Sequence, residues 1–150
     1  MTHREKAIEY FCKGYNCAQS VFAAFCDVTG YSEKDALMLA SSFGGGMGRM
    51  RETCGAVTAM FMVAGAVRGY DDVSTDAPKK AHYELIQTMA AEFKKEYGTI
   101  TCRELLVSLK PDSKPTPSAR TKEYYKVRPC VRFVATAADI VDKMVLNSAE

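Results

Sequence analysis

Four cysteines occupy the same kind of position in this sequence, and their thiols are the side chains best placed to do chemistry. Each follows a residue suited to the start of a helix. The four pairs are Asn16-Cys17, Thr53-Cys54, Thr101-Cys102 and Pro129-Cys130. A thiol at a helix start faces the positive end of the helix dipole and unpaired N–H groups, which favour the thiolate. Each cysteine also begins the apolar stripe of its helix, so we expect four inward-facing thiols, which meet if the helix starts gather at one end of a bundle.

Four converging thiols would supply either four sulfur ligands or two dithiol pairs. The sequence contains six cysteines but no CxxC motif, so the usual zinc-ribbon and thioredoxin signatures are absent. Any metal site must therefore be assembled from distant segments. The alternative is four buried cysteines without chemistry. For Cys12, at the end of the first predicted helix, and Cys26, in the middle of the second, small buried hydrophobes are the favoured interpretation.

Arginine and glycine residues are concentrated near the four cysteines. The arginines are Arg49 and Arg51 before Cys54, Arg103 after Cys102, and Arg128 and Arg132 around Cys130. Positive charge lowers the pKa of a thiol and stabilises an anionic metal–thiolate site, although each arginine is also compatible with a solvated basic face. We expect five residues to surround a bound cofactor: Gly46, Gly48, Arg49, Arg51 and Gly55.

The GGGMG stretch at residues 44–48 is predicted to reverse the chain and pack near Cys54. A dinucleotide-binding loop follows a strand, whereas a predicted helix precedes this stretch. The backbone N–H groups of such a turn are able to donate to a thiolate or a cluster sulfur.

Residues 54–69 form the predicted central element. From Ala56 to Val67 the only polar side chain is Thr58. A helix that is apolar on every side is expected to be buried on every side, and this one is shorter than the ~20 residues needed to cross a bilayer. With Thr53 as the N-cap, Cys54 takes the first helical position.

Helical periodicity dominates the remaining sequence, and no convincing strand is predicted. The expected helices span residues 3–12, 17–28, 33–43, 76–97, 102–109, 121–126 and 129 onward. Residues 110–120 contain three prolines and form the one extended loop. We therefore predict an all-α fold, a compact bundle of about six to seven helices around the helix at 54–69, with residues 1–150 as a single domain.

Composition excludes several classes of partner. The net charge of +2 is too small to indicate nucleic acid, and the N-terminal MTHREKAIEY has no apolar run, so we expect a cytoplasmic protein without membrane insertion. Residues 110–132 carry a net charge of +5 and are interpreted either as a docking surface for an acidic redox partner protein or as a solvated loop. A homodimer is compatible with so apolar a small chain. His82 lies near the apolar stripe of the predicted helix at 76–97. It is interpreted as a ligand, as a proton carrier or as a half-exposed side chain without a chemical role.

The cysteine order and the glycine turn resemble those of the C_GCAxxG_C_C family of redox-active proteins. The resemblance runs from Gly14-Tyr15-Asn16-Cys17 through CGAVTA at 54–59 to Cys130. Carried over residue by residue, the family cysteines are Cys17, Cys54, Cys102 and Cys130. Gly55 and Ala56 match the CGAxxG motif, whereas Ala59 stands where the motif has glycine. The resemblance implies redox activity without naming a reaction.

Three hypotheses follow for the four-cysteine site. The first is an iron–sulfur cluster for electron transfer, because such clusters are held by four thiolates and their potentials respond to hydrogen bonds at the sulfurs. The second is thiol–disulfide exchange by the same cysteines, with thiolates at helix starts as the nucleophiles. The third is a structural zinc site in an interaction module.

Overall fold

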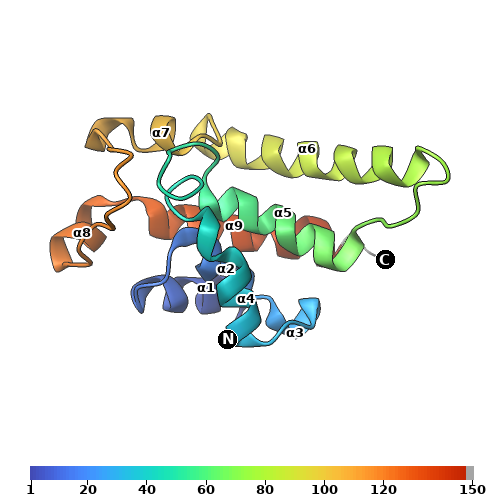
Figure 1. Ribbon diagram of the computed structural model, residues 1–150, viewed down its shortest axis with the longest axis horizontal. Coiled ribbons are helices and arrows are strands. Elements are labelled where there is room, and N and C mark those ends of the chain that lie inside the picture. The colour runs from blue at the N-terminus through green and yellow to red at the C-terminus, as the bar shows by residue number, and fades with distance from the viewer. Residues whose placement is uncertain (148–150) are drawn as a thin grey trace.

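The protein is a bundle of helices without β-strands over residues 1–147, the range that the structure describes (Figure 1). In this computed structural model the all-α prediction is confirmed. The α-helices are α1 (His3–Cys12), α2 (Cys17–Ala23), α3 (Cys26–Thr29), α4 (Glu33–Ala40), α5 (Gly55–Arg68), α6 (Ala77–Tyr97), α7 (Cys102–Leu105), α8 (Lys122–Val127) and α9 (Cys130–Val141). Short 3-10 turns follow α4 at Ser41–Phe43 and α7 at Val107–Leu109, and a π-helical turn at Asp142–Leu146 continues α9.

Helices α5, α6 and α9 run along the long axis of the molecule, and α1, α2 and α4 cover one side of α5 and α9 (Figure 1). The most extensive packing joins α2 to α5 and α1 to α9, and α2 also packs on α4 and α1. The buried side chains form one apolar cluster, to which α6 contributes Met89 and Phe93. This packing brings the starts of α2, α5 and α9 to the same region.

A capping box fixes the start of α2. Its N-cap residue is Asn16, as predicted from the sequence. The Asn16 side chain accepts a hydrogen bond from the Gln19 N–H at 2.9 Å, and the Gln19 side chain accepts one from the Asn16 N–H at 3.1 Å. Such a reciprocal pair satisfies two backbone donors that a helix start leaves unpaired. Cys17 is therefore held as the first residue of α2, as predicted.

The predicted helix at 17–28 is wrong in its second half, because the chain turns at Ala24 and Phe25. Phe25 leaves helical geometry with φ −108° and ψ 19°, and its ring is buried and stacks on His3 at a centroid distance of 4.1 Å. Burial of this ring offsets the loss of helical hydrogen bonds at the break. Cys26 then begins a separate short helix instead of lying in the middle of a long one.

The central helix was placed almost correctly, but its first residue and its burial differ from the prediction. Helix α5 begins at Gly55, so Cys54 is the N-cap residue, and Thr53 instead forms an isolated antiparallel bridge with Thr101. The first half of α5 is buried, whereas residues 65–67 are exposed. Burial on every side therefore holds only for the half of α5 that the bundle covers.

The other boundaries follow the prediction with small shifts. The expected helix at 102–109 is divided into α7 and a 3-10 turn, and the expected helix at 33–43 ends in a 3-10 turn after Ala40. None of the helices in residues 1–147 combines the length and the hydropathy needed to cross a membrane.

Candidate functional site

The four cysteines predicted to converge line one cavity of about 560 Å³. Cys54, Cys102 and Cys130 are buried and Cys17 is half-buried. Neither Cys12, which is exposed rather than buried as predicted, nor the half-buried Cys26 lines this cavity. Four thiols from the starts of α2, α5, α7 and α9 are thus gathered at one place, although they are far apart in the sequence.

Cys17 and Cys130 influence each other's pKa most strongly through a hydrogen bond, in which the Cys17 thiol is the donor and the Cys130 sulfur the acceptor. This bond, ahead of the opposing effect of burial, lowers the pKa of Cys130 to about 7. The positive charges of Arg128 and Arg120 lower it further. The same bond, followed by burial, raises the pKa of Cys17 well above its ordinary value, so the pair keeps one proton and gains one negative charge as the pH rises through 7.

Two arginines beside this pair are held by aromatic rings and backbone carbonyls. The Arg120 guanidinium donates to the carbonyls of Phe11 and Tyr15 at 3.1 and 2.9 Å and lies 4.8 Å from the Tyr124 ring centroid. Arg128 lies over the same ring at 5.1 Å. Arg120 and Tyr124 are not among the predicted site residues; the signal available was the spacing of Arg120, Tyr124 and Arg128 at intervals of four residues.

Cys54 behaves differently, and the prediction that its helix start makes it a thiolate is contradicted. The N–H groups of Ala56 and Val57 point towards its sulfur and favour the thiolate, although neither makes a hydrogen bond of normal geometry. Burial outweighs them and raises the pKa of Cys54 to about 12. No arginine compensates for that burial as Arg128 does at Cys130. Cys54 is therefore a neutral thiol in the folded protein.

Cys102 is positioned by a short antiparallel contact that the sequence did not reveal. The Thr53–Thr101 bridge is flanked by hydrogen bonds from the Cys54 N–H to the Ile100 carbonyl at 2.8 Å and from the Cys102 N–H to the Glu52 carbonyl at 2.6 Å. Since side chains alternate along extended backbone, Cys54 and Cys102 project to the same face, diagonally opposite each other. The bridge thus ties the second pair of thiols to one wall of the cavity.

Arg51 is a buried guanidinium at this wall, with 3% of its surface exposed. Its Nη1 lies 3.7 Å from the Cys102 sulfur and its Nε donates to the Asp112 carbonyl at 2.8 Å, while Nη2 has no hydrogen-bond partner in the described part of the chain. Burial raises the pKa of Cys102, and Arg51 opposes that rise by its hydrogen bond and its charge. The Arg51 guanidinium therefore compensates in part for the effect of burial on the pKa of Cys102.

The GGGMG turn is wound in the left-handed sense and packs against Cys102, and it lines the cavity together with Cys54. Positive φ angles recur from Gly45 to Arg51, at glycine and also at Met47, Arg49 and Arg51. Left-handed backbone costs non-glycine residues about 1–2 kcal/mol each. At Gly46 a Cβ atom would lie 2.6 Å from the Cβ of Cys102, so only glycine allows this approach.

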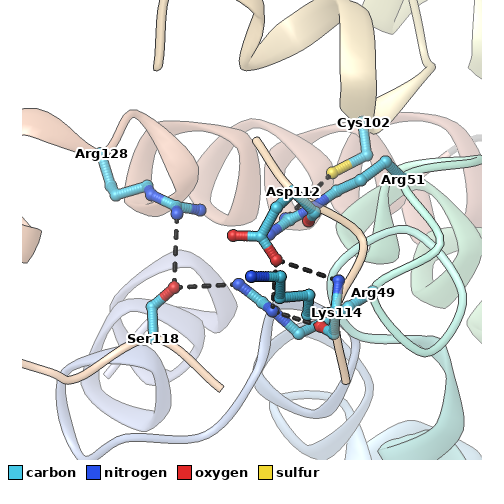
Figure 2. A network of polar contacts seen from close by, with 7 residues as sticks. All are labelled: Arg49, Arg51, Cys102, Asp112, Lys114, Ser118 and Arg128. Carbon is cyan, nitrogen blue, oxygen red and sulfur yellow. Dashed lines mark hydrogen bonds and ion pairs between the residues drawn. The ribbon is translucent and has the colours of Figure 1, made fainter. Parts of the chain in front are cut away.

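Residues 110–120, predicted as an extended loop, fold over the cavity and are fixed there by arginine side chains. Arg49 donates to the carbonyl of Lys114 and, at 3.1 Å, to the Ser118 hydroxyl, and it lies 3.4 Å from an Asp112 carboxylate oxygen. Figure 2 shows these contacts, together with the bond from Arg128 to Ser118. Arg120 and Arg128 of residues 110–132 thus line the cavity, whereas the lysines of this segment are exposed: Lys110, Lys114, Lys122 and Lys126.

The predicted cofactor surroundings all lie at the cavity: Gly46, Gly48, Arg49, Arg51 and Gly55 line it. Two of the other arginines near the cysteines do not, since Arg103 and Arg132 are exposed and outside it. His82 is also remote and packs on Tyr70 at a ring distance of 5.8 Å.

The side chains that line the cavity are chemically suited to bind a metal group through sulfur. Their present arrangement is not. Four thiols and a buried guanidinium suit an anionic metal–thiolate group. However, within residues 1–147 no three His, Cys, Asp or Glu side chains are arranged so that they could hold a metal ion.

The family model described as "putative redox-active protein (C_GCAxxG_C_C)" matches residues 15–144, so the chain belongs to that family. This match contains all four cavity cysteines. No curated protein and no solved structure matches the chain.

Proposed function

We propose that this member of the C_GCAxxG_C_C family performs thiol–disulfide exchange, with Cys130 as the attacking thiol and Cys17 as its resolving partner. The observation that carries the proposal is that these two thiols line the same arginine-lined cavity and shift each other's pKa. Dithiol exchange needs two sulfurs within reach of each other and one thiolate at ambient pH. The acidity of Cys130 supports the assignment of roles within the pair.

The reaction transfers two electrons from the dithiol to a disulfide. The Cys130 thiolate attacks one sulfur of the incoming disulfide, which breaks the S–S bond and releases one thiolate. Cys17 then loses its proton and attacks the Cys130 sulfur, and the second thiolate leaves as the Cys17–Cys130 disulfide forms. The two released thiolates take up protons, so the disulfide is reduced to two thiols while the protein is oxidised.

The surroundings support an attack by Cys130. Arg128 contributes a hydrogen bond as well as positive charge at the thiolate, and Arg120 contributes charge. A thiol whose pKa lies near ambient pH combines a large thiolate fraction with substantial nucleophilicity. Cys54 and Cys102 have raised pKa values and are expected to react slowly.

Oxidation in a thiol–disulfide redox buffer tests the proposal. The reduced protein is equilibrated, alkylated and digested, and its disulfide-linked peptides are identified by mass spectrometry. We expect a reversible bridge between Cys17 and Cys130, and its loss in Cys17→Ser with accumulation of a mixed disulfide at Cys130. A protein in which both residues stay reduced while the buffer oxidises other cysteines would overturn the proposal.

A second candidate is an iron–sulfur cluster bound by Cys17, Cys54, Cys102 and Cys130. The favouring observation is that all four thiols, not two, line one cavity beside an unpartnered Arg51 nitrogen. Such a cluster would supply one-electron transfer, and binding would require the four sulfurs to move into a common ligand set.

Anaerobic purification separates the two candidates. Iron and acid-labile sulfide in stoichiometric amounts in the wild type, and their loss in Cys54→Ser, would favour the cluster. Zinc in place of iron would favour the structural metal site. Metal-free protein with four titratable thiols in the cavity and an intact Cys17–Cys130 couple is the result that thiol exchange predicts.

A further inference from the structure

The cavity wall carries four guanidinium groups and no carboxylate. Arg49, Arg51, Arg120 and Arg128 line it, and no Asp or Glu is among its lining residues within the described chain. Among the residues that the structure describes, Arg49 is the one of the four that forms an ion pair, to Asp112 at 3.4 Å. A strongly one-signed, partly enclosed wall concentrates ligands of the opposite charge. Its composition points to an anionic ligand.

Arg51 is the group that most needs such a ligand. Its side chain is 97% removed from solvent, and its two satisfied nitrogens face a weak sulfur acceptor and a neutral carbonyl. The third nitrogen, Nη2, has no hydrogen-bond partner among residues 1–147. The Asp112 carboxylate, whose pKa Arg51 lowers, pairs with Arg49 and not with Arg51. A buried donor without an acceptor is destabilising, so native proteins usually provide a partner for it.

The backbone at this position is also unusual. Arg51 has a φ of 63°, a conformation that arginine rarely adopts. The left-handed turn ends here and directs Arg51 into the cavity, where its Nε ties down the carbonyl of Asp112 in the covering segment. A strained residue at a cavity wall is typical of functional sites.

We infer that Arg51 is an anion-binding group and that the disulfide reduced at Cys130 is a small molecule carrying a carboxylate. This inference rests on the proposed thiol exchange. A guanidinium pairs with a carboxylate by planar, charge-assisted hydrogen bonds, and Nη2 is free to make one. The small size follows from burial: Cys130 is 6% exposed, residues 110–120 cover the cavity, and a volume of about 560 Å³ is typical of small-ligand sites.

The chemical consequence is that the carboxylate is bound while the disulfide bond reaches the thiols. The Cys130 thiolate attacks one sulfur, and Cys17 displaces the second half as a free thiol, so one small disulfide gives two small carboxylate-bearing thiols. Arg51 takes no part in proton or electron transfer. It selects and positions the substrate. Its contribution therefore appears as a faster reaction with anionic disulfides than with neutral or cationic ones.

Three disulfides with similar chain length and different charge test the inference: dithiodipropionate is anionic, hydroxyethyl disulfide is neutral and cystamine is cationic. The second-order rate constant for oxidation of the reduced protein is measured with each and divided by the rate constant of mercaptoethanol with the same disulfide. We expect the anion to react about tenfold faster than the neutral compound, as for one charge-assisted hydrogen bond. Equal normalised rates for the three compounds would overturn the inference.

Variants assign the preference to one residue. Arg51→Gln is expected to bring the anion-to-neutral ratio close to unity, whereas Arg51→Lys is expected to keep part of it. Arg103→Gln is the matched control, because Arg103 is exposed and lies outside the cavity. Survival of the full preference in Arg51→Gln would overturn the assignment. Thermal unfolding of each variant is recorded, and the wild-type ratio stands independently of any variant.

A non-exchangeable probe separates this inference from the proposed function. Thiodipropionate has the two carboxylates but no disulfide, and its binding to Cys130→Ser protein is measured by calorimetry. We expect saturable binding that is at least tenfold weaker when Arg51→Gln is added. If binding is found but no disulfide oxidises Cys17 and Cys130, the proposed exchange fails and the anion site stands. If exchange proceeds without charge preference and thiodipropionate does not bind, the exchange stands and the anion site fails.

Discussion

The starts of α5 and α9 present the same residue type in nearly the same local setting, with opposite results. Cys54 is the N-cap of α5 and Cys130 is the first residue of α9, and both are buried. The pKa of Cys54 is raised to about 12 by burial, whereas the pKa of Cys130 is lowered to about 7, first by the hydrogen bond from Cys17. The position at a helix start therefore does not decide the charge state of a thiol here.

The neighbours of each sulfur account for the difference. Backbone N–H groups at the start of α5 favour the thiolate, but they do not compensate for removal of the sulfur from water. At the start of α9 the sulfur gains a thiol donor from α2 and a guanidinium from Arg128. A specific donor and a nearby charge thus outweigh burial at Cys130, whereas the amide N–H groups of the helix start do not outweigh it at Cys54.

Replacement of the two cysteines is expected to give the largest contrast. At pH 7 about half of Cys130 and only about one Cys54 thiol in 10⁵ is ionised at the stated pKa values. Cys130→Ser is therefore expected to abolish the fastest phase of alkylation by iodoacetamide, and Cys54→Ser to leave it unchanged. Stopped samples analysed by mass spectrometry measure this. A fast phase that survives in Cys130→Ser would contradict the assignment of the reactive thiolate to Cys130.

The second largest effect is expected from a change of packing at the start of α5. A Cβ atom at Gly55 would lie 2.8 Å from the Phe43 carbonyl oxygen and 3.1 Å from the Ala18 nitrogen. Gly55→Ala is therefore expected to lower the free energy of unfolding by about 2 kcal/mol. Gly65→Ala is the matched control in the same helix, since no atom lies within 4 Å of its added Cβ, and it is expected to stabilise by ~0.5–1 kcal/mol. Denaturant unfolding of both variants measures the pair; equal effects would contradict this packing.

Stability should depend on pH in opposite directions at the two sites. Between pH 7 and 9 the unfolded chain holds a proton at Cys130 that the folded chain has lost, so this residue adds stability as the pH rises and loses it as the pH falls through 7. Cys54 adds stability below pH 9 and loses it as the pH rises towards 12.

The measurement is the difference in unfolding free energy between wild type and each serine variant as a function of pH. The difference for Cys130→Ser is expected to grow by about 2 kcal/mol from pH 6 to 9. The difference for Cys54→Ser is expected to be flat over that range and to shrink above pH 9. If the two differences depended on pH in the same way, the opposite pKa shifts of Cys130 and Cys54 would be contradicted.

Removal of one guanidinium should give the smallest effect. Arg128→Gln withdraws charge and a hydrogen bond from Cys130 while the larger contribution from Cys17 stays. We expect the pKa of Cys130 to rise and its alkylation rate at pH 7 to fall several-fold, with the rate recovered at higher pH. Arg132→Gln, an exposed arginine outside the cavity, is the control and should leave the profile unchanged. An unchanged profile in Arg128→Gln would show that Arg128 does not contribute to the acidity of Cys130.

The sequence was sufficient to identify the cavity cysteines and most helix boundaries. Asn16, with Gln19 three residues later, signals the start of α2 locally, and α9 begins at Cys130 directly after Pro129. The long apolar run from Ala56 to Val67 likewise identifies the central helix by composition alone. Local capping and periodicity determine these features, so a single sequence carries them.

The remaining features depend on contacts between distant segments. The bridge between Thr53 and Thr101 comes from two residues that cap no helix by their side chains and pair only in the folded chain. Similarly, the break of α2 near Phe25 depends on the stacking of that ring on His3. The acidity of Cys130 depends on Cys17, which lies 113 positions away in the sequence. No local pattern reports such pairings.

The most direct test is a pH titration of thiol alkylation resolved by residue in the reduced wild-type protein. Rates for the peptides that contain Cys17, Cys54, Cys102 and Cys130 are recorded between pH 5 and 11. We expect Cys130 to reach half of its maximal rate near pH 7 and the other three to react appreciably only above pH 9. A Cys54 that titrates at or below the pH of Cys130 would contradict the account.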